Sequence, residues 1–160
     1  MPRLAELGFA LRTFLRAYRW RRLDPVPLAR LGKPLERCRV ALVSSAGLVA
    51  PGDVPFDETV KGGDWGCRWI AGGAEVQGLE EHHRSDSFDH RGIAADRNVA
   101  LPLDRLRELH QRGEIGEVAP RHASLMGSIT APGRLIKWTA PAVAETFAAD
   151  GVDVALLVPV

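Results

Sequence analysis

The stretch DGVDVALLVPV at residues 150–160 is the feature that most constrains the fold of this chain. Asp150-Gly151 is a typical helix stop, because glycine adopts the left-handed conformation just past a helix C-terminus without strain. Residues 152–158 are then a nearly continuous apolar run, which is typical of a strand covered on both faces. A helical pattern precedes this run, so a helix is expected to lead directly into a buried strand.

Other segments extend this alternation of strand and helix. Strands are expected in CRVALVSSAG (38–47), CRWIAGG (67–73) and EVAPRHASLMGS (117–128), and a helix in LPLDRLRELHQRGEIG (101–116). Strands that alternate with helices indicate an α/β fold with a largely parallel sheet. In such folds the loops after the strands form the ligand site, and we expect the same here.

The first 39 residues differ in charge from the rest of the chain. They hold ten Lys or Arg against three acids, whereas the remainder holds eleven against seventeen. Residues 3–20 have apolar side chains at helical spacing and arginines on another face, which predicts a basic amphipathic helix. We therefore expect this helix and a proline-rich linker in residues 1–32, followed by an α/β domain in residues 33–160. The helix would pack on its own domain or a sister subunit, or else lie on a membrane surface.

Composition excludes several other classes of protein. No apolar run approaches the length of a membrane-spanning helix, and the N-terminus lacks the apolar segment of a secretory signal peptide. Cys38 and Cys67 form neither a disulfide framework nor a metal motif, so the reducing cytoplasm is the expected location. No nucleotide-binding glycine motif is present, and neither nucleic-acid binding nor membrane insertion is expected.

Three polar turns are candidate sites. SSAG (44–47) follows a buried strand, and its small residues would let backbone N–H groups approach a ligand, although a plain strand-to-loop turn has the same sequence pattern. HHRSDSFDH (82–90) holds potential metal ligands, but its spacing matches no standard motif, and the loop could equally position substrate or be solvated. RHASLMGS (121–128) offers Arg121 as a carboxylate clamp and His122 as a proton carrier, or is simply a strand edge.

Four of these stretches together resemble one protein family. RVALVSSAG, HRSDSFDHRGIAADRNVALPLDRLRELHQRGEIG, APRHASLMGSITAPGRL and DGVDVALLVPV are similar, in this order, to the selenoprotein B family of glycine, sarcosine and betaine reductases. That family includes the related D-proline reductase subunit. The resemblance covers roughly residues 33–160, and it does not indicate one substrate.

The resemblance implies an oxidoreductase that reductively cleaves a C–N bond in an amino acid or betaine. A selenocysteine or cysteine attacks the carbon next to the carboxylate, the amine leaves, and thioredoxin-type dithiols supply the electrons. Other reductase subunits would be partners in a homo- or hetero-oligomer, and a pyruvoyl group on one of them is a further cofactor that the resemblance allows. No metal and no cofactor within the chain itself are expected.

In that family the nucleophile stands directly after the strand matched by VALLVPV, where it opens the next helix. A helix N-terminus lowers the pKa of a thiol or selenol, so this position suits a nucleophile. We therefore expect selenocysteine or cysteine immediately after Val160, with an in-frame UGA codon ending the chain as written. On this interpretation the C-terminal part of the domain is missing, and the 160-residue form is inactive.

The resemblance also locates the remaining site residues. The predicted substrate-binding residues are Ser44, Ser45, Gly47, Asp86, Asp89, Arg121, Ser124, Gly127 and Ser128. Residue chemistry then predicts that Arg121 holds the substrate carboxylate and that His90 or His122 protonates the leaving amine.

Two other functions remain open at this point. The chain could be a non-catalytic binding or assembly subunit, or half of a split enzyme whose second chain supplies the nucleophile. A metal-dependent hydrolase built on residues 82–90 is a third interpretation, and it would require a bound metal.

Overall fold

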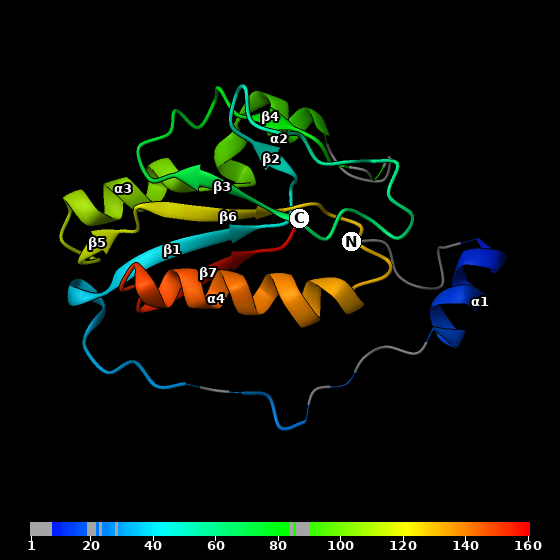
Figure 1. Cartoon of the computed structure of the whole chain (residues 1–160), viewed down its shortest axis with the longest axis horizontal. Helices are drawn as coiled ribbons and strands as arrows, with labels where there is room; N and C mark the ends of the chain where they lie inside the picture. Colours follow the sequence, from blue (N-terminus) through cyan, green and yellow to red (C-terminus); the bar gives the residue numbers. More distant parts are fainter. Residues whose placement is uncertain (1–7, 19–21, 23, 28, 84, 86–89) are drawn as a thin grey trace. The chain divides into compact units, whose positions relative to one another are not determined.

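The computed structural model describes residues 8–18, 22, 24–27, 29–83, 85 and 90–160 (Figure 1). It divides the chain into two compact units, residues 1–30 and 31–160. The first unit holds helix α1 (Phe9–Ala17), which lies within the helix predicted over residues 3–20; the residues of that helix before position 8 and after position 18 lie outside the described residues. No described helix is long and apolar enough to cross a membrane.

The second unit is built on one mixed sheet. Its central strand, β1 (Arg39–Ser44), runs parallel to β5 (Glu117–Val118), β6 (Arg121–Leu125) and β7 (Val154–Val158). Strand β3 (Cys67–Ala71) runs antiparallel to β6 at the edge of the sheet. The α/β class is therefore confirmed, and most of the sheet is parallel, but β3 makes it mixed.

Strands β5 and β6 pair with successive parts of β1. Glu117 and Val118 lie opposite Arg39 and Val40, whereas Ala123 and Ser124 lie opposite Val43 and Ser44. Between these two paired segments, residues 41 and 42 of β1 lie opposite four residues, 119–122, of the neighbouring stretch. These extra residues interrupt the backbone ladder in the way that a β-bulge does.

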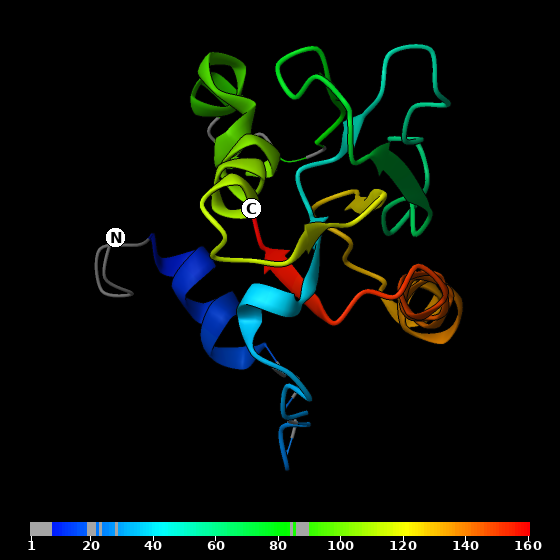
Figure 2. The same cartoon turned by 90° about the vertical axis from the view of Figure 1, so that its left-hand side faces the viewer.

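Helices cover both faces of the sheet, as the two views show (Figures 1 and 2). Val40 and Leu42 of β1 pack on the side of α3 (Leu103–Gln111), in a core cluster that also holds Leu103 and Leu106. Ala41 of β1 packs on the opposite side with Val143 and Phe147 of α4 (Ala140–Ala149). Burial on both faces explains why β1 reads as a continuous apolar run rather than an alternating one.

Helix α4 continues a five-residue π-helix, η4 (Leu135–Thr139). Pro141 is the second residue of α4 and follows η4 directly, so it lies inside a continuous helix in which its missing N–H removes one hydrogen bond. The helix that the sequence predicts before the run at residues 152–158 is therefore present.

The connection between β1 and α3 holds four short elements that the sequence pattern did not predict. These are β2 (Leu48–Val49), β4 (Glu80–Glu81), α2 (His90–Ala95) and the 3₁₀-helix η3 (Arg97–Val99). Strands β2 and β4 form a separate antiparallel pair. A second 3₁₀-helix, η2 (Leu35–Arg37), precedes β1.

The prediction that β7 is covered on both faces is wrong. Its backbone pairs with β1 along all five residues, but Leu156 is 48% exposed and Leu157 is 68% exposed. The described part of the chain contributes no strand to the other edge of β7. A run of apolar residues alone does not distinguish an edge strand from a central one, because both can pair along their full length.

Candidate functional site

The parallel strands β1, β6 and β7 end at the same edge of the sheet, which is where α/β folds bind ligands. The turn after β1 contains Ser44, Ser45 and Gly47. Ser44 is fully buried; its hydroxyl donates to the Ala100 carbonyl (2.7 Å) and accepts from the Ala46 N–H (3.2 Å). Both bonds are internal, so Ser44 stabilises the turn and presents no free group to a ligand.

Gly47 is also a structural residue. It has a φ of +66°, and a Cβ at this position would lie 2.8 Å from the carbonyl carbon of His82. The N–H of His82 donates to the Gly47 carbonyl (2.9 Å). The space that the sequence assigned to a ligand is therefore filled by the backbone at residues 82 and 83.

Ser45 connects this turn to the segment after β7. The Val160 N–H donates to the Ser45 hydroxyl (3.0 Å), which in turn lies 3.4 Å from the Val160 carbonyl oxygen. The Ser45 N–H donates to the Val158 carbonyl (3.2 Å). Val160 is thus held at the carboxyl end of β1, beside the other turns of the site.

Gly127, in the turn after β6, packs against Ser45 and His83. A Cβ at Gly127 would lie 1.9 Å from Nε2 of His83 and 2.7 Å from the Ser45 carbonyl oxygen. Only glycine permits this contact. The neighbouring Ser128 is exposed and has a φ of 55°, which is uncommon for a residue with a side chain.

His83 is buried (8% exposed) where it packs against Gly127. Its Nδ1 accepts a hydrogen bond from the Ser85 N–H (3.1 Å), which places the ring proton on Nε2. Burial lowers the pKa of His83; Glu81 opposes this shift and His90 adds to it. The ring is therefore neutral near pH 7.

His90, the first residue of α2, forms a contact of a different kind. Its Nδ1 lies 2.7 Å from a carboxylate oxygen of Glu81, and its Nε2 lies 3.0 Å from the Ser85 carbonyl oxygen. Both of these partners are acceptors, so a ring that donates to both carries two protons and a positive charge. Its ring centroid is 6.2 Å from that of His83.

A chain of contacts therefore runs across the carboxyl edge of the sheet. It leads from Val160 through Ser45, Gly127 and His83 to His90, whose charge Glu81 stabilises. The side chain of His90 is 43% exposed, so a bound molecule that replaced the Ser85 carbonyl as the partner of Nε2 could exchange a proton with it. Asp86 and Asp89, which the sequence placed in the same loop, lie outside the described residues.

Arg121 and His122 do not join this cluster. Because β6 runs parallel to β1, Arg121 stands at the amino end of β6, about 13 Å along the strand from the carboxyl edge. Its Nη2 donates to Oδ1 of Asp150 (3.0 Å), its Nε lies 2.7 Å from the other carboxylate oxygen, and its guanidinium lies over the ring of Trp69. This position does not support the predicted role of Arg121 as the substrate's carboxylate clamp.

His122 is a buried structural residue. Its Nδ1 accepts a hydrogen bond from the Leu42 N–H (3.0 Å), which has lost its strand partner at the interruption between β5 and β6. Burial, with a smaller contribution from the charge of Arg107, lowers the pKa of His122 to about 4. A ring that is neutral and inaccessible near pH 7 cannot be the acid that protonates a leaving amine. Ser124, on the same strand, is fully buried as well.

Neither cysteine is placed to act as the nucleophile. Cys38 is fully buried, and burial raises the pKa of the Cys67 thiol to about 11. A thiol with such a pKa is almost entirely protonated near pH 7, so it is a poor nucleophile.

Two residues of the cluster were not predicted as site residues. His83 was considered only as a metal ligand, and Glu81 was not considered. The described residues contain no group of three His, Cys, Asp or Glu side chains arranged to hold a metal ion. A signal for Glu81 was nevertheless present, since the sequence EEHH places acids directly before the histidines.

Comparison with known proteins supports the resemblance seen in the sequence. Residues 9–159 match the family model for glycine/sarcosine/betaine reductase selenoprotein B. The chain is 31% identical to the D-proline reductase subunit gamma of Acetoanaerobium sticklandii over 125 residues, which are 78% of this chain and 50% of that protein. It is 28% identical to the glycine reductase complex component B subunit gamma of Carboxydothermus hydrogenoformans over 134 residues, 84% of this chain and 31% of that protein.

A third relative is the sarcosine reductase complex component B subunit beta of Peptoclostridium acidaminophilum, 27% identical over 84% of this chain and 30% of that protein. The chain thus spans half or less of the length of these relatives. No solved structure matches it. The family model covers nearly the whole sequence, and the chain belongs to the glycine/sarcosine/betaine reductase selenoprotein B family.

Proposed function

We propose that this chain is part of a reductase subunit that cleaves the C–N bond of a carboxylate-bearing amine, such as glycine, sarcosine, betaine or D-proline. The family match and the names of the relatives support this reaction class. The observation that carries the proposal is the pair of contacts between Val160 and Ser45, which hold the strand β7 and the turn after it against the histidine cluster.

The nucleophile in this proposal is a selenocysteine or cysteine that follows Val160 in a longer form of the protein. Consecutive Cα atoms are about 3.8 Å apart, so residue 161 would begin next to the Ser45 turn. It would also stand at the carboxyl end of a parallel strand, where a following helix lowers the pKa of a thiol or selenol. Neither Cys38 nor Cys67 offers such an environment.

His90 is the proton donor in this reaction. The selenolate or thiolate attacks the carbon next to the carboxylate and forms a new Se–C or S–C bond. The C–N bond breaks, and the nitrogen keeps the bonding electron pair and takes a proton from His90; the amine leaves, except from D-proline, where it stays attached and the ring opens. Glu81 keeps the ring protonated through its 2.7 Å contact with Nδ1.

Two electrons are then needed to release the carbon fragment and regenerate the nucleophile. A thioredoxin-type dithiol supplies them in this proposal, and other subunits receive the intermediate. The relatives are named as subunits of reductase complexes, which supports partner subunits of this kind.

The test is an activity assay on the full-length gene product with its partner subunits. We expect release of ammonia or amine from glycine, sarcosine or betaine, or ring opening of D-proline, only when a dithiol is present. His90→Gln should lower the rate by about 10²–10⁴-fold, because it removes the general acid. His110→Gln, at an exposed position on α3, is the matched control and should leave the rate unchanged. An unchanged rate in His90→Gln would remove His90 from the mechanism, and a reaction independent of dithiol would contradict the reductase assignment.

One observation favours a binding or assembly role as a second candidate. Helix α1 and the residue that follows it expose three aromatic side chains, Phe9 (75%), Phe14 (58%) and Tyr18 (47%). Large exposed apolar side chains are typical of a surface that a partner covers. Replacing Phe9 and Phe14 by Ser should abolish co-purification with the partner subunits if the helix docks them, whereas unchanged co-purification would exclude this role.

A further inference from the structure

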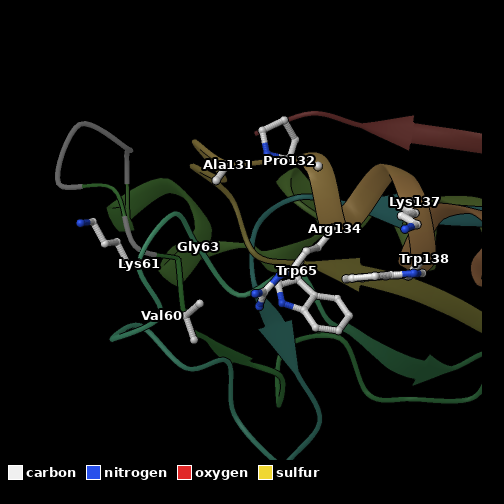
Figure 3. A pocket seen from close by; sticks show the side chains of 10 residues that line it. Val60, Lys61, Gly63, Trp65, Ala131, Pro132, Arg134, Lys137 and Trp138 are labelled. Atoms are coloured by element: carbon white, nitrogen blue, oxygen red, sulfur yellow. The ribbon is translucent and has the colours of Figure 1, made fainter.

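A cavity of about 550 Å³ that shares no lining residue with the histidine cluster lies between the loop at residues 60–65 and the segment at residues 131–138 (Figure 3). Two indoles, Trp65 and Trp138, form part of its wall, with ring centroids 5.6 Å apart. Lys61, Arg134 and Lys137 also line it, and no acidic residue does. Figure 3 shows Trp65 and Arg134 next to each other in this wall.

Backbone contacts fix the two sides of the cavity relative to each other. Gly62 has a φ of +93°, and a Cβ there would lie 2.6 Å from the Cβ of Ala131. The Ala131 N–H donates to the Gly62 carbonyl (3.1 Å), and the Thr139 hydroxyl donates to the Trp65 carbonyl (2.6 Å). The cavity is therefore formed before any ligand arrives.

The three cations of the cavity have no anionic partner within the described part of the chain. Seven other basic residues of the domain form ion pairs: Lys33, Arg39, Arg68, Arg105, Arg107, Arg112 and Arg121. Two of these cations, Arg134 and Lys137, instead contact the indoles. The Arg134 guanidinium is 5.9 Å from the centroid of the Trp65 ring, and the Lys137 ammonium is 5.2 Å from that of Trp138.

We propose that this cavity is a binding site for a small organic anion whose flat, apolar part packs against the two indoles. A carboxylate or phosphate group would pair with Arg134 and Lys137, which have free hydrogen-bond donors. A cationic ligand is disfavoured because the chain's own cations already occupy positions over the indole rings. This inference does not rest on the proposed reductase function, since the cavity shares no lining residue with the histidine cluster.

The test uses three probes of the same shape and different charge: benzoate, benzyl alcohol and benzylamine. Each is titrated into the full chain labelled with ¹⁵N, and the indole N–H signals are followed by NMR. Benzoate should shift the signals of Trp65 and Trp138 in a saturable way, while the signal of Trp69 stays in place. Because a charge-assisted hydrogen bond is lost with the neutral probe, benzoate should bind at least about tenfold more tightly than benzyl alcohol.

Arg134→Gln should weaken benzoate binding about tenfold for the same reason. Arg105→Gln, which removes an exposed charge on α3 far from the cavity lining, is the matched control. Circular dichroism and the melting temperature show that each variant is folded, and Lys137→Gln provides a second variant. Equal affinity for the three probes, no saturable shift with benzoate, or unchanged binding in both cavity variants would overturn the proposal. Benzoate binding is measured without the reductase reaction. The proposed binding site and the proposed reductase function can therefore be disproved separately.

Discussion

His122 replaces a missing strand partner in the sheet. The interruption between β5 and β6 leaves the Leu42 N–H without a backbone acceptor, and Nδ1 of His122 accepts its hydrogen bond instead. The bond requires a neutral ring, because a protonated imidazole has no acceptor. The histidine is therefore a structural residue whose protonation opposes folding.

The pH dependence of stability follows from this bond. The pKa of His122 is about 4 in the folded chain, compared with about 6.5 when unfolded. The unfolded state binds the proton more tightly, so stability is fully present above pH 6.5 and falls as the pH drops toward 4. From pH 7 to pH 5 this group should lower the free energy of unfolding by about 2 kcal/mol.

His122→Asn tests this account, because asparagine keeps an acceptor but does not titrate. Urea unfolding at pH 7, 6 and 5 should show a shallower acid dependence in this variant than in the wild type. His110→Asn, at an exposed site, is the control and should keep the original slope. Equal slopes in wild type and His122→Asn would show that His122 does not carry the acid sensitivity.

Gly127 is the residue whose replacement most directly disturbs the candidate site. A methyl group at this position overlaps Nε2 of His83 and approaches the Ser45 carbonyl oxygen. Gly127→Ala should destabilise the fold by about 1–3 kcal/mol, the usual cost of forcing extra volume into a packed region. Gly73→Ala, where an added methyl group meets nothing within 4 Å, should have a much smaller effect. Similar melting temperatures for the two variants would mean that His83 does not pack as described.

At the scale of elements, strand β7 has an open edge and exposed apolar side chains. Leu157 is 68% exposed, and Leu156 is 48% exposed on the same strand. An exposed edge of this kind favours pairing with another chain, whether a copy of itself or a partner.

Leu157→Lys should reduce self-association of the 160-residue form, because a lysine on an edge strand opposes strand pairing. Sedimentation velocity would measure the change. Val99→Lys, at another exposed apolar position (62%), serves as control and should leave self-association unchanged. If both variants associate to the same extent as the wild type, the edge of β7 is not the surface responsible.

The sequence predicted the long elements of the fold better than the short ones. Strands lie within the segments predicted at 38–47, 67–73 and 117–128, and helices lie within 101–116 and before residue 152, because an apolar run or a helical period marks each of them. Strands of two residues, such as β2 and β4, leave no measurable period. The antiparallel direction of β3 was also beyond prediction, since it depends on the path of the loop before it rather than on its own residues.

At the scale of the whole molecule, the site was predicted in part. Ser45, Gly127 and His90 come together with His83 because strand ends meet at one edge of a parallel sheet. Arg121 and His122 were misplaced because RHASL is itself the strand rather than the turn after it. A residue reaches this site only if it lies at the carboxyl end of its strand. The composition of a strand does not show at which end a residue lies.

The family assignment and the geometry lead to one central claim. We propose that the redox nucleophile follows Val160 in a longer form of the protein, next to Ser45 and the pair formed by His83 and His90. The matched residues make up only 50%, 31% and 30% of the three relatives, so each relative contains further segments that this chain does not match.

The most direct test is to sequence the gene for several hundred nucleotides around and beyond the codon of Val160. The account predicts a TGA or a cysteine codon at position 161, followed by an open frame with a further cysteine two or three residues later. For TGA, a selenocysteine-insertion hairpin should follow. A TAA or TAG codon with no continuing frame, or any other amino acid at position 161, would contradict the claim and favour a binding or split-subunit role.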